Sequence, residues 1–178
     1  MPALDPTVSW IVALGASVLF ASAAVHKLRD WPRFTGALAD YRILPTRALP
    51  IAAPIVVALE VAVAALVFSP ATRVAGAWLA ATLLACYAGA LAINLRRGRT
   101  SIDCGCLGFT RRRRIGAGMV VRNVVLCALV LLAAWPQTAR GLVALDAMTI
   151  VAATAVCALL YLAIETLASN ALIARGAR

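Results

Sequence analysis

The sequence is poor in charged residues and poorest in acidic ones. Only 13% of its 178 residues are charged, and Asp and Glu together number 7. A soluble domain carries about twice that charged fraction, because its surface must stay hydrated. With 63% hydrophobic residues and a mean hydropathy of +0.93, the composition excludes an ordinary soluble globule.

Long polar segments are also scarce. The longest polar interludes are residues 27–49 and 96–114, which leaves no room for a large extramembrane domain or a low-complexity linker. The chain has a single histidine, His26, so a closed zinc site of the usual four ligands is not indicated. We therefore expect one compact membrane domain.

Hydrophobic runs are what the sequence has in abundance. A membrane-spanning helix needs about 20 mostly apolar residues, since its backbone polar groups must be satisfied within the segment. Five runs meet this requirement, at residues 8–25, 50–68, 73–95, 115–135 and 142–168. They predict an all-α, polytopic helical bundle. The first run lacks the basic start of a signal peptide, and we expect it to be retained.

The distribution of basic residues predicts an orientation. The 17 Lys and Arg residues give a net charge of +10, which could suggest nucleic-acid binding if taken alone. With five spans, however, all basic clusters fall on one side of the membrane, and only Arg73 and Arg140 fall on the other. The positive-inside rule then places the N-terminus outside and the C-terminus in the cytoplasm, with membrane lipids rather than nucleic acid as the partner.

Residues 31–44 have the character of an interfacial helix. Pro32 suits a helix start, and Pro45 suits its end before the second span. The basic and aromatic residues between them favour the lipid headgroup surface, although a plain connector would have a similar sequence.

The loop at residues 96–114 carries a closely spaced cysteine pair, Cys104 and Cys106, separated by Gly105. Two cysteines at this spacing can close a small, strained disulfide ring, which would be more oxidising than a relaxed bridge. The surrounding arginines favour the thiolate, whereas Asp103 opposes it electrostatically but could relay a proton. Two thiolates could also hold a soft metal ion, and this alternative stays open.

Several polar residues fall within the predicted spans. Glu60, Arg122, Asn123 and Glu165 are costly in hydrocarbon, so each indicates either a buried pair or a functional group. Arg122 is the expected partner of Glu60 or of Glu165. His26 ends the first span, where a headgroup anchor and a site role are equally consistent with the sequence.

One further polar pattern lies in the last span. Cys157, Tyr161 and Glu165 recur at four-residue intervals and predict a polar seam on one face of that helix. The remaining single cysteines, Cys86 and Cys127, are interpreted with Cys157 as packing residues, because an unpaired cysteine behaves as a small hydrophobe.

The motifs together resemble one known family. They are His26 to Asp30, Tyr41 to Pro45, the intramembrane Glu60, Asn94 to Arg99, Ile102-Asp103-Cys104-Gly105-Cys106-Leu107-Gly108, and Val121-Arg122-Asn123. This set resembles the MauE methylamine-utilisation membrane family, which is similar in turn to the DoxX-type membrane proteins. The resemblance implies a four-helix core with a fifth helix, and a link to thiol, sulfur and quinone redox chemistry.

The resemblance also implies a function. It points to processing, transport or maturation of the disulfide-rich beta subunit of periplasmic methylamine dehydrogenase, beside a thioredoxin-like partner. Cys104 and Cys106 match the family's motif and would carry thiol-disulfide exchange. No cofactor is specified, although a quinone is one candidate electron partner. The charge pattern places the cysteine loop inside whereas the implied client lies outside, and the sequence does not resolve this conflict.

Two other functions remain open at this point. The first is transport of a thiophilic metal or sulfur species, with the cysteines as ligands and with Glu60 and Glu165 along the path. The second is a non-catalytic membrane assembly factor.

Overall fold

The computed structural model describes residues 3–99 and 115–176, with side chains up to residue 167. The helices are α1 (Pro6–Arg29), α2 (Trp31–Asp40), α3 (Leu49–Phe68), α4 (Arg73–Arg96), α5 (Ala117–Leu131) and α6 (Ala144–Gly176), with short 3₁₀ turns η1 (Thr46–Ala48) and η2 (Leu132–Ala134). Five of these helical segments are long and apolar enough to cross a membrane. The protein is therefore a multi-pass membrane helical bundle, which confirms the predicted fold class.

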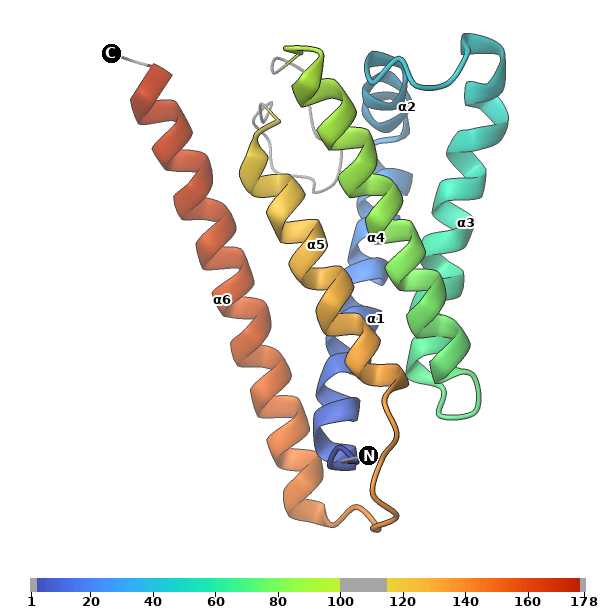
Figure 1. Ribbon diagram of the computed structural model, residues 1–178, viewed down its shortest axis with the longest axis vertical. Helices are drawn as coiled ribbons and strands as arrows, with labels where there is room; N and C mark the ends of the chain where they lie inside the picture. The colour runs from blue at the N-terminus through green and yellow to red at the C-terminus, as the bar shows by residue number, and fades with distance from the viewer. Residues whose placement is uncertain (1–2, 100–114, 177–178) are drawn as a thin grey trace.

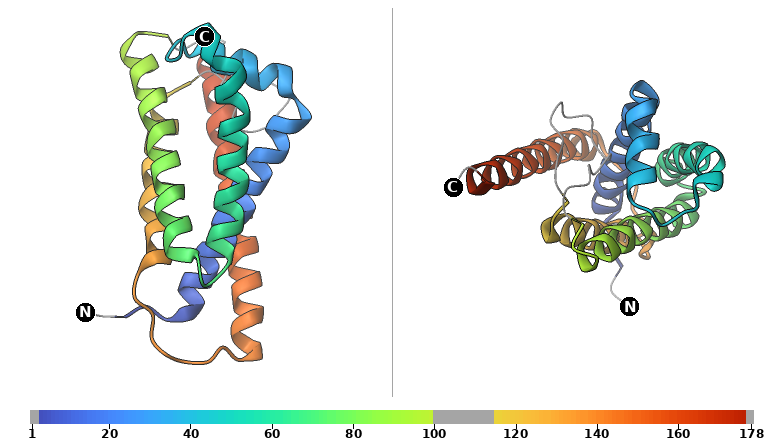
Figure 2. Two further views of the ribbon diagram at one scale, coloured as in Figure 1. Left: turned by 90° about the vertical axis from the view of Figure 1, so that its right-hand side faces the viewer. Right: turned by 90° about the horizontal axis from the view of Figure 1, so that it is seen from above.

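The five long helices run up and down along a common direction (Figure 1). α1, α3, α4 and α5 enclose the main core, in which Phe20, Val63, Leu84 and Val130 are buried together. None of the described side chains of α6 belongs to that cluster. α6 packs mainly along α1 and stands to one side of the other helices when the bundle is seen from its end (Figure 2).

α1 and α2 start with the residues that helix capping favours. Asp5 precedes α1 and its carboxylate accepts a hydrogen bond from the backbone N–H of Thr7. Asp30 caps α2 in the same way through the backbone N–H of Arg33. Each cap satisfies a backbone donor that the first helical turn would otherwise leave unpaired.

α2 is shorter than the predicted interfacial segment of residues 31–44. It ends at Asp40, and Arg42 adopts a left-handed backbone conformation with φ of 46°. This conformation cannot continue a helix, so the chain turns before Pro45. α2 lies across one end of the bundle and packs Phe34 against Ala24, Ala53 and Val57.

The two ends of the bundle differ in charge. The end that holds α2 also holds the start of α3, the end of α4 and the start of α5 (Figure 1). We call it the arginine-rich end, defined by Arg29, Arg33, Arg42, Arg47, Arg96, Arg97 and Arg99. Arg73 and Arg140 belong to the opposite end.

Candidate functional site

The centre of the candidate site is a buried ion pair between α1 and α3. Lys27 Nζ lies 2.5 Å from Glu60 Oε1, and the two side chains are only 5% and 1% exposed. Each charge lowers the cost of burying the other in a hydrocarbon interior. The pairing therefore explains how both residues are accommodated within the bundle.

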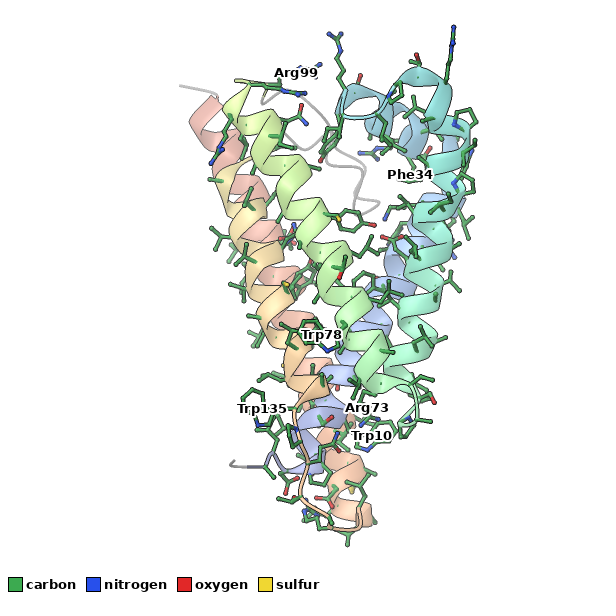
Figure 3. The ribbon with its side chains drawn as sticks, turned by 45° about the vertical axis from the view of Figure 1, so that its right-hand side comes forward. Trp10, Phe34, Arg73, Trp78, Arg99 and Trp135 are labelled. Atoms are coloured by element: carbon green, nitrogen blue, oxygen red, sulfur yellow. The ribbon has the colours of Figure 1, made fainter. Side chains whose placement is uncertain are left out.

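Aromatic side chains complete the surroundings of this ion pair. Tyr87 of α4 donates its hydroxyl hydrogen to Glu60 Oε1 at 2.8 Å. The ammonium of Lys27 also faces the rings of Phe34 and Tyr87, at 5.5 and 5.7 Å from their centroids. Both rings are within the range of a cation–π attraction. Figure 3 shows Phe34 where α2 covers this part of the bundle.

The two oxygens of Glu60 have different environments. Lys27 and Tyr87 both use Oε1, whereas Oε2 is buried and has no hydrogen-bond partner among the described residues. A buried polar atom of this kind calls for an explanation, such as a bound water or another ligand.

A second ion pair lies between α5 and α6. Arg122 Nη1 is 3.2 Å from Glu165 Oε1, with the two side chains 14% and 7% exposed. The neighbouring Asn123 is buried and donates its side-chain amide to the backbone oxygen of Met119 at 2.7 Å. Arg122 and Asn123 thus turn polar groups toward the interior from the start of α5.

A small cavity lies between these groups. It has about 40 Å³ of free space, enough for roughly three water molecules. All five long helices contribute to its wall, which consists of Leu19, Phe20, Ala23, Lys27, Glu60, Leu84, Tyr87, Arg122, Asn123, Leu126 and Tyr161. Apolar side chains dominate the list, and each of the five helices contributes at least one polar residue.

The structure thus brings together four of the residues singled out in the sequence. Glu60, Arg122, Asn123 and Tyr161 line the cavity, and Glu165 is joined to it through Arg122. His26 is half-buried on α1 and is not part of the wall. Cys104, Cys106 and Asp103 lie outside the described residues, so their redox role stays a prediction.

Sequence reasoning left Lys27, with His26, between a headgroup anchor and a site residue, and it missed both the pairing of Lys27 with Glu60 and the role of Tyr87. Of the two partners proposed for Arg122, the structure shows Glu165, while Glu60 pairs with Lys27. Lys27 had the position of a headgroup anchor at the end of a span, but in the structure it is surrounded by Glu60, Tyr87 and Phe34. The predicted seam on α6 is correct for Tyr161 and Glu165 but wrong for Cys157, whose side chain is exposed.

A separate polar cluster lies at the opposite end of the bundle. Arg73 is 3% exposed, stacks over Trp10 at 4.0 Å, and donates to Ser9 Oγ and to the Val67 backbone oxygen, each at 3.4 Å. Trp10 and Arg73 appear side by side in Figure 3. The contact with Val67 places a cation at the carbonyl end of α3, where the helix dipole favours it, so this cluster has a structural explanation.

The fold and the cavity define a multi-pass membrane protein with two ion pairs beside a largely apolar cavity inside a helical bundle. Residues 5–136 match the family described as "Methylamine utilisation protein MauE", a stretch that includes α1 to η2 and stops before α6. The chain belongs to the MauE family, which confirms the resemblance seen in the sequence.

Individual relatives agree with this assignment. The chain is 36% identical over 163 residues to the methylamine utilization protein MauE of Methylophilus methylotrophus, covering 90% of this chain and 86% of the relative. It is 41% identical over 129 residues to the protein of the same name from Paracoccus denitrificans, covering 72% and 69%. No solved structure matches the chain significantly.

Proposed function

We propose that this protein serves methylamine utilisation as a membrane thiol-disulfide redox protein, which assists maturation of the disulfide-rich beta subunit of methylamine dehydrogenase. The observation that carries the proposal is that the family match over residues 5–136 includes the pair Cys104 and Cys106. The other three cysteines, Cys86, Cys127 and Cys157, are free thiols carried singly by α4, α5 and α6. The loop pair is therefore the candidate for two-electron thiol chemistry.

The proposed reaction is an exchange with a thioredoxin-like partner. A thiolate of the reduced pair attacks the partner's disulfide and forms a mixed disulfide, while the partner's other sulfur leaves as a thiolate. The second cysteine of the pair then displaces the partner. One S–S bond is broken and one is formed, and two electrons pass from the pair to the partner. Run in reverse, the same steps return the pair to the dithiol.

The orientation belongs to the proposal as well. The arginine-rich end carries Arg99, the last described residue before the loop, and Arg140 lies at the opposite end. By the positive-inside rule, we place the arginine-rich end at the cytoplasmic face of the bacterial plasma membrane, with the N-terminus outside.

Single serine substitutions test the redox role. We expect Cys104→Ser or Cys106→Ser to abolish formation of active methylamine dehydrogenase, and Cys104→Ser to trap a mixed disulfide through Cys106. Cys86→Ser and Cys157→Ser serve as matched controls, because both side chains are exposed on apolar helices. Full maturation of the beta subunit with both loop cysteines replaced would refute the redox role and favour an assembly factor.

Labelling of the loop cysteines tests the orientation. A membrane-impermeant maleimide should not reach Cys104 in intact cells, but it should react after the membrane is permeabilised. Cys106, Cys86, Cys127 and Cys157 are replaced in this variant so that only one thiol remains. Labelling in intact cells would reverse the proposed orientation and leave the exchange chemistry untouched.

A further inference from the structure

We propose that Glu60 is a proton-binding site in the interior of the membrane, reached through water held in the cavity beside it. This inference rests on the described ion pairs and cavity and is independent of the thiol chemistry proposed above.

The geometry around Glu60 leaves one oxygen available for a proton. Both hydrogen-bond donors, Lys27 and Tyr87, contact Oε1, while Oε2 has no partner in the described part of the chain. A proton can therefore attach to Oε2 without breaking either contact. Oε1 then acts as a carbonyl oxygen that still accepts from both donors, and the new O–H can donate into the cavity.

The surroundings of Lys27 reduce the free-energy cost of adding a proton to Glu60. A buried ammonium that depended on Glu60 alone would resist protonation of its partner, because its own charge would be left uncompensated. Lys27 also faces the rings of Phe34 and Tyr87, whose negative faces attract the ammonium whatever the charge of Glu60. The site thus supports Lys27 both with Glu60 ionised and with Glu60 neutral.

The cavity supplies the path for the proton. An internal water needs two to four polar partners and enough room, and the cavity offers about 40 Å³ of free space. Its wall includes the polar residues Glu60, Arg122, Asn123 and Tyr161. Water in this space would hydrogen-bond to Glu60 Oε2 and remove the cost of leaving that oxygen unpaired.

The charges facing the cavity select a proton over a larger cation. The charged and titratable groups that line the cavity with Glu60 are Lys27 from α1, Tyr87 from α4, Arg122 from α5 and Tyr161 from α6. The two ion pairs are balanced, since Glu165 offsets Arg122. A metal ion or an ammonium entering the cavity would meet two existing cations, whereas a proton joins Oε2 covalently.

Infrared difference spectroscopy on the full-length protein in lipid vesicles tests the proposal. Acidification should produce a protonated-carboxyl band that shifts in D₂O, which shows that the site exchanges with water. Glu60→Gln should remove the band. Asp146→Asn also converts a carboxylic acid to an amide, but at the opposite end of the bundle, and it should leave the band in place. If no band depends on Glu60 at any pH at which the protein stays folded, the proposal is wrong.

A second pair of variants tests the proposal even if Glu60→Gln does not fold. Tyr87→Phe removes one hydrogen-bond donor to Oε1 and should shift the carboxyl band of Glu60 to higher frequency. Phe34→Leu leaves both donors to Oε1 in place and should shift the band less. A band whose frequency Tyr87→Phe leaves unchanged does not report on Glu60, and that outcome would overturn the assignment.

Discussion

Arg122 of α5 and Glu165 of α6 form an ion pair at 3.2 Å that ties the outermost helix to the rest of the bundle. α6 otherwise packs mainly along α1. We expect Arg122→Met and Glu165→Gln each to lower the stability of the folded protein in detergent. A double-mutant cycle should give a coupling of about 0.5–3 kcal/mol, the range for residues in contact. Additive effects of the two substitutions would show that the pair does not hold α6.

The ion pair of Lys27 and Glu60 predicts an asymmetry between single and double substitutions. Lys27→Met leaves a carboxylate buried without its cation, a change that costs about 3–5 kcal/mol in buried pairs. Lys27→Met combined with Glu60→Gln removes both charges and should recover much of that loss. The measurement is the free energy of unfolding in detergent. A double variant less stable than Lys27→Met would contradict this account.

Gly76 allows the close approach of α4 to α3. A Cβ at this position would lie 2.5 Å from the backbone nitrogen of Val67 and 2.7 Å from the carbonyl carbon of Leu66. Because backbone atoms cannot yield as a flexible side chain can, Gly76→Ala should destabilise the protein by about 1–3 kcal/mol. Gly89→Ala, on the same helix but with no atom within 4 Å, is the matched control and should be nearly neutral. Thermal unfolding of the two variants compares them directly.

Asp5, Thr7, Arg140 and Asp146 form an exposed cluster at the end of the bundle opposite the arginine-rich end. This cluster predicts that the stability of the fold depends on pH. Arg140 bonds the carboxylate of Asp5 at 2.8 and 3.0 Å and, with Thr7, holds the pKa of Asp5 well below its usual value of 3.8. A lowered pKa stabilises the fold above pH 3.8, and the contribution is lost as pH falls below that value toward the folded-state pKa. The effect should be small and sensitive to salt, because the groups are exposed.

Unfolding at pH 7 and at pH 3 checks this expectation. The wild-type protein should lose more stability on acidification than Asp5→Asn, which lacks the titrating carboxyl group. An equal loss in both proteins would assign the acid sensitivity to other residues.

The sequence predicted the five long apolar helices because each depends only on local length and polarity. The 73–95 run and α4 agree almost residue for residue, since Arg73 and Arg96 bound an uninterrupted apolar segment. Polar residues within the spans could also be recognised, because they interrupt otherwise apolar segments. Glu60, Arg122 and Glu165 could thus be identified as a set.

The pairing among those residues could not be predicted in the same way. Lys27 lies at the end of α1, where most lysines reach the headgroups, and its burial depends on α2 folding back so that Phe34 covers it. The partner of Glu60 is therefore set by tertiary packing. Tyr87 was missed for a related reason, because a tyrosine within an apolar helix gives no sign of which neighbour its hydroxyl will contact.

The arrangement of the two ion pairs along the chain has a consequence for biogenesis. Lys27 and Glu60 lie on α1 and α3, so both are synthesised early and can pair while the later helices are still in the ribosome. Arg122 must enter the membrane with α5, and its partner Glu165 arrives only with α6. The last helix to be made thus neutralises Arg122, which is already in the membrane. A chain that stops before α6 would leave Arg122 without Glu165, and we expect membrane quality-control proteases to degrade it.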